Sequence, residues 1–432
     1  MCKKGLFIEG HIGVWMRFAL SALVCLIFSA PAWAVDYTIT DLGTLGGTTS
    51  YARSYARGIN NNGQVVGAAG TADGLEHAFL YSNGSMLDLG TLGGTYSYAF
   101  SINNNGQVVG SAVTDEDQNH AFLYSNGSMI DLGTLGGMSS YARDINNNGQ
   151  VVGYDILDEY GEMRAFLYSN GSMMDLFPGS GGGAVGINNN GQVLGSAYGS
   201  TVIYSNGNIN YLDFGGPGDA YGINDNAQVV GSYESPPGGG SWHAFLYSNG
   251  STIDLGTLSG RSSTAFSINN NDQVVGWSRL LPPPDEGDGR HAFLFSNGSM
   301  MDLNSLIPAN SGWTCLIVAY DINDRGQIVG YGDFNGQDRA FLLTPAYAEQ
   351  WIGSLIETVN SLDLKQGITT SLEAKLHAAL NAAHANEKTT ACNLMNAFIN
   401  TVSAQSAKKI TVDQANQLIA AAWQIKAALP CH

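Results

Sequence analysis

The stretch YAFSINNNGQVVG, residues 98–110, decides the fold, because versions of it recur along most of the chain. The block INNNGQVVG, or a close variant of it, begins at Ile59, Ile102, Ile145, Ile187, Ile223, Ile268 and Ile322. Successive copies start 36 to 54 residues apart. Such a period is typical of repeat architectures, in which each copy is one supersecondary unit that packs on its neighbours.

Each unit reads as four short antiparallel strands. In the second copy, residues 98–103 and 107–112 predict two strands joined by a tight turn, since Asn and Gly accept a positive φ at low cost. Residues 120–125 and 129–132 predict two more strands around a second Asn-Gly turn. Four strands in about 43 residues is the period of a β-propeller blade.

The two ends of the repeat region predict a closed ring. The seventh unit stops after its third strand, while residues 37–43, YTITDLG, resemble an isolated fourth strand ahead of the first unit. If this strand joins the last blade, no sheet edge is left at the seam. The sequence therefore predicts a seven-bladed β-propeller of four-stranded blades over residues 35–345, closed by its N-terminal strand, rather than an open solenoid.

Two further blocks accompany each INNNGQVVG copy. HAFLYSNGSM, with variants, begins at His77, His120, Arg164, Ser200, His243, His291 and, shortened, Arg339, and DLGTLGG closes most units. Together these blocks resemble the HAF repeat of predicted extracellular bacterial proteins, over about 300 residues. The resemblance implies an exported repeat protein without an established biochemical activity.

Residues 1–34 predict a leader with a signal peptide. The segment 17–34, RFALSALVCLIFSAPAWA, has a positive start, a short apolar run and a small-residue ending. The run is too short to cross a bilayer, which needs roughly 20 residues. We expect cleavage after Ala34, with Met16 as an alternative start of translation, no transmembrane segment in the mature chain, and a secreted or periplasmic location.

The charge of the chain bears on its partners. The formal net charge is −18, and only 12% of the residues are charged. Phosphate backbones repel such a surface, which argues against nucleic acid as a partner. A carbohydrate or a protein is the expected partner, and the oligomeric state stays open.

The composition changes after Pro345, where glycine becomes rare and alanine common. Residues 346–432 predict a four-helix module. Thr370 and Thr411, each followed three residues later by Glu or Gln, predict capping boxes. The third and fourth helices, packed antiparallel, would bring Cys392 and Cys431 together in a disulfide and leave Cys315 as the odd thiol. Residues 391–399 and 410–421 resemble the FIMAH-type module of exported bacterial proteins, which implies an accessory or attachment role.

Residues that every unit repeats are expected to build blades. The first asparagine of the block is such a residue, at Asn60, Asn103, Asn146, Asn188, Asn224, Asn269 and Asn323. These amides either form a ring of ligands around the channel or satisfy buried backbone groups, and the second reading is favoured. The histidines of HAFLYSNGSM share one blade position, so they spread around the ring rather than converge as zinc ligands do. No catalytic residue is predicted.

The variable loops provide the candidate binding site. The loops between the second and third strands of a blade, and between blades, project from the same face, where binding residues usually lie. Aromatic residues on or near this face suit sugar rings or a protein surface, although packing between blades would explain them as well. They are Tyr96, Tyr141, Trp242, Trp277 and Trp313.

A calcium site is the one cofactor site that the sequence offers. Asp333, Asn335 and Asp338 place oxygen ligands around a glycine, as calcium loops do, but the distal glutamate of an EF-hand is missing. A solvated acidic turn is the alternative reading.

Three functions follow from these observations. The first is an extracellular, non-catalytic binding or surface-interaction protein whose variable-loop face takes carbohydrate or protein ligands. The second is a secreted glycoside or polysaccharide hydrolase that uses carboxylates from different blades. The third is a purely structural repeat protein. The fold alone does not decide among them.

Overall fold

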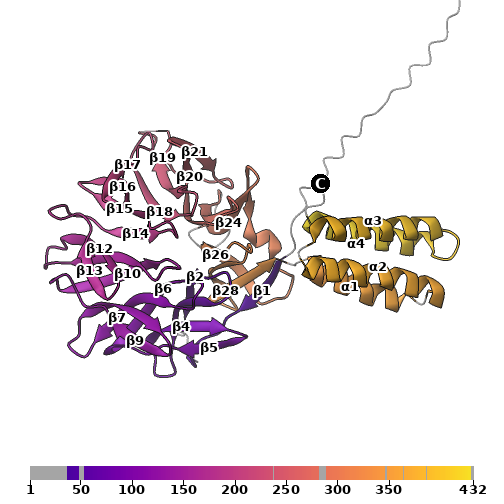
Figure 1. Ribbon diagram of the computed structural model, residues 1–432, viewed down its shortest axis with the longest axis horizontal. Coiled ribbons are helices and arrows are strands. Elements are labelled where there is room, and N and C mark those ends of the chain that lie inside the picture. Colours follow the sequence, from indigo (N-terminus) through magenta and orange to yellow (C-terminus); the bar gives the residue numbers. More distant parts are fainter. Residues whose placement is uncertain are drawn as a thin grey trace, which may run out of the picture.

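The computed structural model describes residues 37–47, 53–236, 238–281, 289–345, 348–362, 364–385 and 387–429. Seven four-stranded antiparallel sheets stand around a common axis, and four helices lie beside this ring (Figure 1). The predicted seven-bladed β-propeller is therefore confirmed. The predicted leader, residues 1–34, lies outside the described residues.

The strands of each blade follow one another from the central axis outward. Blade one consists of β2 (Ser54–Ile59), β3 (Val65–Gly70), β4 (Glu76–Ser82) and β5 (Ser85–Asp88), and blade two of β6 (Gly93–Ile102), β7 (Val108–Thr114), β8 (Asn119–Ser125) and β9 (Ser128–Asp131). Blade three consists of β10 (Ser139–Ile145), β11 (Val151–Ile156), β12 (Met163–Ser169) and β13 (Ser172–Asp175), and blade four of β14 (Ala184–Ile187), β15 (Val193–Ala197), β16 (Ser200–Ser205) and β17 (Asn208–Tyr211).

Blades five to seven repeat the pattern. Blade five consists of β18 (Gly218–Ile223), β19 (Val229–Glu234), β20 (Trp242–Ser248) and β21 (Ser251–Gly256). Blade six consists of β22 (Ser263–Ile268), β23 (Val274–Arg279), β24 (Arg290–Ser296) and β25 (Ser299–Asp302). Blade seven consists of β26 (Trp313–Ile322), β27 (Ile328–Phe334), β28 (Gln337–Pro345) and β1 (Tyr37–Asp41). A short 3₁₀ helix, η1 (Leu303–Leu306), follows blade six.

The N-terminal strand closes the ring as the sequence predicts. β1 pairs antiparallel with β28, from Tyr37 opposite Pro345 to Asp41 opposite Phe341. Two hydrogen bonds, of 2.9 and 3.2 Å, join the Arg339 guanidinium to the Asp41 carboxylate across this pair of strands. The last blade thereby gains its fourth strand from the other end of the chain.

The repeated glycine of Gln-Val-Val-Gly is needed because two strands approach closely. A Cβ atom on Gly67 would overlap the carbonyl oxygen of Tyr55 on the innermost strand. The neighbouring side chains form the core between sheets, and the phenylalanine of the HAF block is fully buried in six blades, at Phe79, Phe122, Phe166, Phe245, Phe293 and Phe341. Burial of this large ring between adjacent blades explains why the block is repeated.

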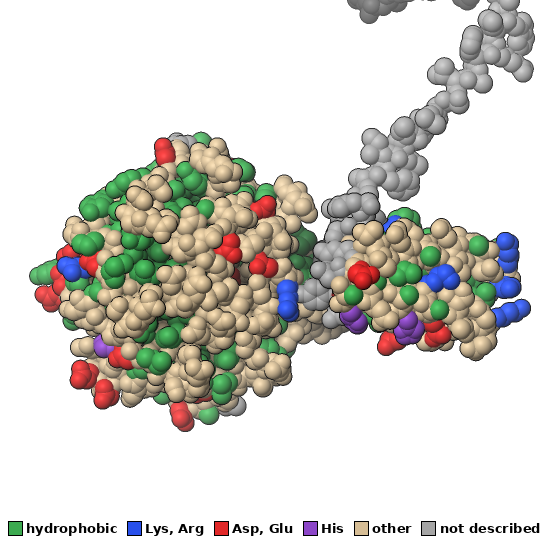
Figure 2. Space-filling view, in the orientation of Figure 1, with side chains coloured by type: hydrophobic (Ala, Val, Ile, Leu, Met, Phe, Trp, Pro, Cys, Tyr) green, Lys and Arg blue, Asp and Glu red, His purple; other side chains and the backbone are tan. Residues whose placement is uncertain are grey.

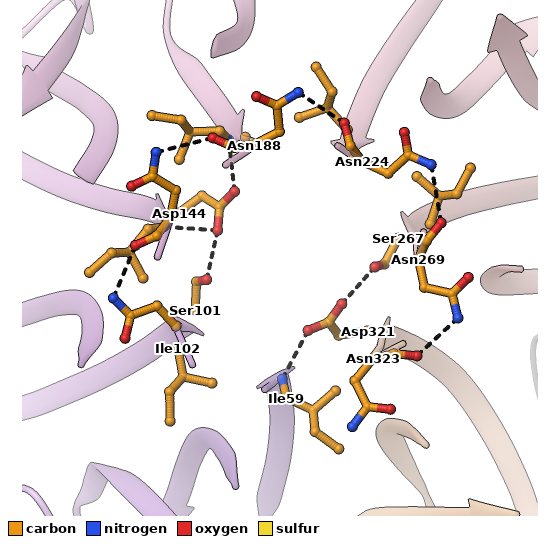
Figure 3. Close-up of a pocket in the computed structure, with 18 of the residues that line it drawn as sticks. Ile59, Ser101, Ile102, Asp144, Asn188, Asn224, Ser267, Asn269, Asp321 and Asn323 are labelled. Carbon is orange, nitrogen blue, oxygen red and sulfur yellow. Dashed lines mark hydrogen bonds between the residues drawn. The ribbon is translucent and has the colours of Figure 1, made fainter. Parts of the chain in front are cut away.

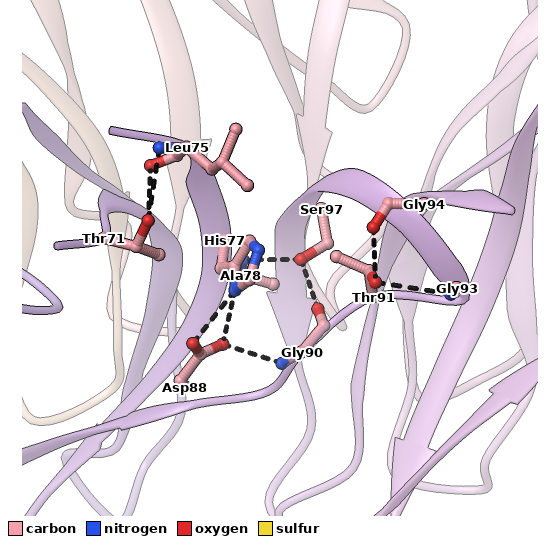
Figure 4. A network of polar contacts seen from close by, with 10 residues as sticks. All are labelled: Thr71, Leu75, His77, Ala78, Asp88, Gly90, Thr91, Gly93, Gly94 and Ser97. Atoms are coloured by element: carbon pink, nitrogen blue, oxygen red, sulfur yellow. Dashed lines mark hydrogen bonds and ion pairs between the residues drawn. The ribbon is translucent and has the colours of Figure 1, made fainter. Parts of the chain in front are cut away.

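The histidines of the HAF block pair with the aspartates of the DLG block (Figure 4). His77 Nδ1 lies 2.9 Å from the Asp88 carboxylate, which also accepts a hydrogen bond from the Gly90 amide. Ser97 Oγ then links the Gly90 carbonyl to the Ala78 amide. The same pair occurs at His120 and Asp131, His243 and Asp254, and His291 and Asp302. These histidines therefore hold the two outer strands together in four of the seven blades.

Four helices form a separate core after the propeller. They are α1 (Ala348–Ser361), α2 (Gln366–His384), α3 (Lys388–Gln405) and α4 (Val412–Ala428), and buried residues of all four pack into one cluster. Lys and Arg side chains gather at the end of this bundle that points away from the propeller, whereas acidic side chains are scattered over the propeller (Figure 2). Among the described residues, no helix is both long and apolar enough to span a membrane.

The two predicted helix caps differ in outcome. Thr411 caps α4, and Gln414 reciprocates in a full capping box, as predicted. The cap at Thr370 is wrong, because α2 already begins at Gln366 and Thr370 Oγ1 donates to the Gln366 carbonyl inside the helix. Ile368, in the extra first turn, is buried in the bundle core, which favours the earlier start.

Cys392 takes part in a disulfide. Its predicted partner, Cys431, lies outside the described residues, so this pairing stays a prediction. Cys315 is a free thiol.

Candidate functional site

The innermost strand of every blade carries a β-bulge at the same place. In blade one, Ala56 pairs with Gly67 and Gly58 pairs with Val66, so Arg57 is left without a partner in the ladder. The corresponding bulge residues of blades two to seven are Phe100, Arg143, Val185, Tyr221, Phe266 and Tyr320. A bulge redirects one side chain of a strand, and bulges often lie beside functional sites.

The seven bulge residues line one cavity in the central channel. Its volume is about 550 Å³, which is the size of a typical small-ligand site. The cavity extends from the bulge residues to the Asn-rich turns that end the innermost strands. It therefore lies toward the face of the short turns, on the side opposite the variable loops.

Two guanidinium groups project into this cavity from blades one and three. Arg57 lies over the ring of Tyr320, with 3.9 Å from its Cζ to the ring centroid, and Arg143 lies over Phe100 at 4.7 Å. Within the described parts of the chain, neither guanidinium has a hydrogen bond or salt bridge to a protein acceptor. Burial lowers the pKa of Arg143, and the positive charge of Arg57 acts in the same direction.

Aromatic rings form a continuous arc on the wall made by blades five to seven. The rings of Tyr221 and Phe266 have centroids 5.4 Å apart, and those of Phe266 and Tyr320 are 5.3 Å apart. Tyr320 also stacks on Tyr331 of the next strand at 6.0 Å. Tyr221 is 37% exposed, so part of this arc is accessible from the channel.

Two carboxylates lie on opposite walls of the channel (Figure 3). Asp144 accepts hydrogen bonds from Ser101 Oγ at 2.7 Å and from the amides of Ile145 and Ile187. Because Ser101, Asp144 and Ile187 belong to three consecutive blades, this carboxylate connects their innermost strands. Burial raises the pKa of Asp144 to about 6 despite the three donors.

Asp321 makes the same connection across the seam of the ring. It accepts hydrogen bonds from Ser267 Oγ at 2.6 Å and from the amides of Ile322 and Ile59, which belongs to blade one (Figure 3). Burial raises its pKa as well. The position after each bulge thus reads, around the ring, Gly58, Ser101, Asp144, Gly186, Gly222, Ser267 and Asp321. In this order around the ring, each aspartate comes after a serine that donates a hydrogen bond to it and before a glycine.

Two closed rings of hydrogen bonds form the rim of the cavity. The Nδ2 atom of the first asparagine in each turn donates to the carbonyl oxygen of the equivalent asparagine in the next blade, at 2.9–3.1 Å, from Asn60 around to Asn323 and back. The backbone amide of the second turn residue donates to the side chain of its counterpart in the next blade, at 2.8–3.0 Å. The repeated amides therefore serve backbone groups and join blades.

The rim differs between its two sides. On blades five and seven the second turn residue is Asp225 or Asp324, and the Asn270 amide lies between these carboxylates and donates to both. On blades two and three it is Asn104 or Asn147, whose Nδ2 atoms have no hydrogen bond to any described residue. The amide and guanidinium donors without a described protein acceptor thus lie on blades one to three, whereas the rim carboxylates Asp225 and Asp324 and the aromatic arc lie on blades five to seven.

The aromatic residues predicted from the sequence do not form one site. Among the described residues no ring contact joins any two of the five. Tyr96 and Trp242 are 40% and 37% exposed, on blades two and five. Tyr141 stacks on Tyr154 at 5.2 Å, and Arg290 lies 5.7 Å from the Trp277 ring.

Trp313 lies in the core of blade seven rather than on an exposed surface. It is 7% exposed and packs against Phe334 and Phe341, with ring centroids 5.0 and 6.1 Å away. A ring buried in this way has no face left for a ligand, because its neighbours within the blade already cover it.

The predicted calcium residues lie on the hairpin between β27 and β28. Asn335 and Gly336 form its tight turn with positive φ angles. Asp333 accepts hydrogen bonds from Thr314 Oγ1 and the Gly336 amide, and Asp338 accepts one from the Tyr55 hydroxyl. A calcium ion would have to compete with these donors. No group of three or more His, Cys, Asp or Glu residues suited to a metal occurs among the described residues, and a calcium site with Asn335 stays a prediction.

The sequence analysis missed the channel residues, although a signal for them was present. The position two residues before each INNNGQVVG isoleucine holds Arg, Phe, Arg, Val, Tyr, Phe and Tyr in turn. Its neighbour on the N-terminal side is alanine in every unit. This position varies in charge, size and polarity between the constant alanine and the constant isoleucine, which indicates a residue that the blade itself does not require.

Comparison with known proteins gives one family match. A family model described as "Protein of unknown function (DUF3466)" matches residues 214–318, about a quarter of the chain. This segment holds blades five and six and the start of β26. No curated protein matches the sequence.

Several solved β-propellers are similar to this chain at low sequence identity. The WD40 β-propeller domain of Doa1 has 14% identity and a TM-score of 0.39, covering 70% of this chain and 96% of that one. TolB from Acinetobacter baumannii has 12% identity and a TM-score of 0.38, covering 65% and 63%. The Aleuria aurantia lectin, crystallised as a mutant with Fucalpha1-6GlcNAc, has 10% identity and a TM-score of 0.34, covering 61% and 98%. No functional conclusion is drawn from similarities this distant.

Proposed function

We propose that this chain is an exported, non-catalytic binding protein that holds a small ligand in the central channel of its propeller. One observation carries the proposal. The bulge residues differ in charge and size from blade to blade, between a constant alanine and a constant isoleucine, and all seven line the same cavity of about 550 Å³. A concave site with a few convergent polar groups is the usual form of a ligand pocket.

Export is proposed from the leader sequence, and attachment from the helical bundle. The signal-like segment 17–34 and the resemblance to HAF repeats support a secreted or periplasmic location. The resemblance of the C-terminal helices to FIMAH-type modules supports an accessory role for the bundle. The variable-loop face, with Tyr96 and Trp242 exposed on separate blades, is the weaker candidate for ligand binding because its aromatic residues do not converge.

Thermal-shift screening against saccharides and small organic acids tests this proposal. A ligand that binds only the folded state raises the melting temperature. The shift should disappear in Phe266→Val, a substitution that the bulge tolerates, since Val185 occupies the same position in blade four.

Trp242→Ala serves as the matched control on the variable-loop face, and it should keep the ligand-induced shift. Retention of the shift in Phe266→Val together with its loss in Trp242→Ala would place binding on the loops and contradict the channel proposal.

A hydrolase is the second candidate, and the two carboxylates of the channel favour it. Asp144 and Asp321 come from different blades, line one cavity, and have raised pKa values, as catalytic acids often do. Against this, each carboxylate already accepts three hydrogen bonds that connect blades. Turnover of a glycoside panel that is abolished in Asp144→Asn, with the fold retained, would establish the hydrolase instead.

A further inference from the structure

We propose that the ligand of the central channel is a sugar acid, whose carboxylate is bound by Arg57 and Arg143 and whose ring packs on Tyr221 and Phe266 of the aromatic arc. This inference rests on the proposed function and specifies the ligand class of the same site.

The guanidinium groups indicate an anionic ligand. Each guanidinium carbon lies over an aromatic ring, and its N–H donors have no described protein acceptor. Within the described chain no carboxylate forms a salt bridge with Arg57 or Arg143. The nearest candidates by position, Asp144 and Asp321, direct their oxygens to serines and backbone amides instead. These N–H donors are therefore open to an incoming anion, which would supply the acceptor that the chain does not.

The rest of the channel indicates an anion of single charge. The carboxylates of Asp144 and Asp321 line the same cavity, and those of Asp225 and Asp324 lie on its rim. These four groups repel a doubly charged phosphate or a polyanion more than they repel one carboxylate. Arginine also matches a carboxylate geometrically, through two parallel N–H···O bonds.

The aromatic arc indicates a hydroxylated ring. Tyr221 and Phe266 offer apolar ring faces, whereas Tyr320 already has Arg57 over its ring and Tyr331 stacked on it. The carboxylates of Asp225 and Asp324 beside them can accept further hydrogen bonds. A sugar has both an apolar face and hydroxyl donors for these carboxylates. A purely aromatic acid would stack equally well but would offer the rim carboxylates no hydroxyl donor beyond the turn amides that already donate to them.

Isothermal titration calorimetry with four probes tests this inference: glucuronate, glucose, benzoate and glucose 6-phosphate. The purified protein should bind glucuronate at least about tenfold more tightly than glucose or benzoate, since one charge-assisted hydrogen-bonded contact is sufficient for that ratio. Glucose 6-phosphate should bind more weakly than glucuronate, because it carries the larger negative charge.

Variants of the bulge residues identify the groups responsible. Arg143→Val should reduce glucuronate affinity about tenfold, to the level of glucose, while glucose binding changes little. Arg143→Lys keeps the charge but loses the planar guanidinium, so its affinity for glucuronate should lie between those of the unaltered protein and Arg143→Val. Trp242→Ala should bind all four probes as the unaltered protein does, and melting temperatures show whether each variant is folded.

The remaining outcomes separate the two proposals. If glucose, benzoate or glucose 6-phosphate binds at least as tightly as glucuronate and loses affinity in Phe266→Val, the channel binds ligands but the sugar-acid assignment is wrong. If glucuronate binds equally well to Arg143→Val, the assignment is also wrong. If no probe binds at concentrations up to about 10 mM, both proposals are contradicted for these ligand classes. A Kd of that size corresponds to a binding free energy of only about 3 kcal/mol.

Discussion

The Nδ2 atom of Asn323 donates a hydrogen bond of 2.9 Å to the carbonyl oxygen of Asn60, and this contact completes a ring of seven across the two ends of the repeat region. Every other member of the ring joins neighbours in the sequence order of the blades. The seam between blades seven and one is thus sealed by the same hydrogen bond that joins all other blades.

Removal of the Asn323 amide should destabilise the propeller measurably. Asn323→Ala deletes the bond to Asn60 and leaves buried groups without their partners, including the amides of Arg325 and Gln327. We expect a loss of about 2–4 kcal/mol in the free energy of unfolding, measured by urea denaturation.

Asn62 is the matched control for this prediction. It lies on the exposed side of the equivalent turn in blade one and donates one bond to the next blade. Asn62→Ala should therefore cost less than about 1 kcal/mol. Equal losses in both variants would mean that the buried ring has no special role in stability.

Arg339 replaces the histidine of other blades at the closing strand. Its guanidinium holds Asp41 of β1 with two bonds, and both side chains are mostly buried. Arg339→Ala should lower the free energy of unfolding by about 1–2 kcal/mol. Arg339→His should recover part of this loss, because His77 and Asp88 form the equivalent pair in blade one. Failure of histidine to rescue stability would show that the seam requires the longer side chain.

Asp144 should make stability fall as the pH rises between about 4 and 6. Its pKa is raised from 3.8 to about 6 in the folded state, so the folded protein binds a proton more tightly than the unfolded chain does. The stabilisation by that proton is therefore complete at low pH and is lost as the pH passes through 6.

Asp144→Asn cannot titrate and reports this effect by difference. The unfolding free energy of the unaltered protein, relative to the variant, should decrease by about 1–3 kcal/mol from pH 4 to pH 7. Asp321→Asn should show the same direction, since burial raises that pKa too. A difference that is constant with pH would contradict the assignment.

His291 should stay protonated well above neutral pH. The Asp302 carboxylate, 2.7 Å from its Nδ1, raises the pKa of His291 from 6.5 to about 10, with Cys315 acting in the same direction. The pair thus contributes stability that is complete below pH 6.5 and is lost as the pH rises toward 10. NMR titration of the His291 ring measures this directly, and a midpoint near 6.5 would show that the pairing with Asp302 has little effect.

Trp313 and Trp242 should respond oppositely to truncation. Trp313→Ala removes a buried ring that contacts Phe334 and Phe341, and we expect a loss of about 3–5 kcal/mol in unfolding free energy. Trp242→Ala, at the exposed start of β20, should cost less than about 1 kcal/mol. Urea denaturation of both variants distinguishes a core ring from a surface ring without knowledge of any ligand.

Repetition made the fold predictable, and the same repetition concealed the site. The repeat period, the Asn-Gly turns and the isolated segment 37–43 together specify seven closed blades, because each blade must bury its faces on the next. The bulge at Arg57 and its equivalents, in contrast, could not be predicted from the repeat. It adds one residue to a strand, and strand alternation alone does not reveal where that residue is inserted.

The aromatic residues show a second limit of the sequence. Trp313 and Trp242 both begin an innermost or third strand and look alike as exposed candidates, yet one is buried by Phe334 of its own blade. Burial of this kind depends on the angle between strands, which is a property of the assembled sheet.

The pairing of β1 with β28 also constrains the order of events during synthesis. Thr38 leaves the ribosome among the first residues of the propeller, and its partner Thr344 follows 306 residues later. Until then the growing chain is an open arc with two unpaired ends, and loop closure over such a span is entropically unfavourable. The circular arrangement therefore makes synthesis of β28, rather than of any earlier blade, the event that allows the ring to close.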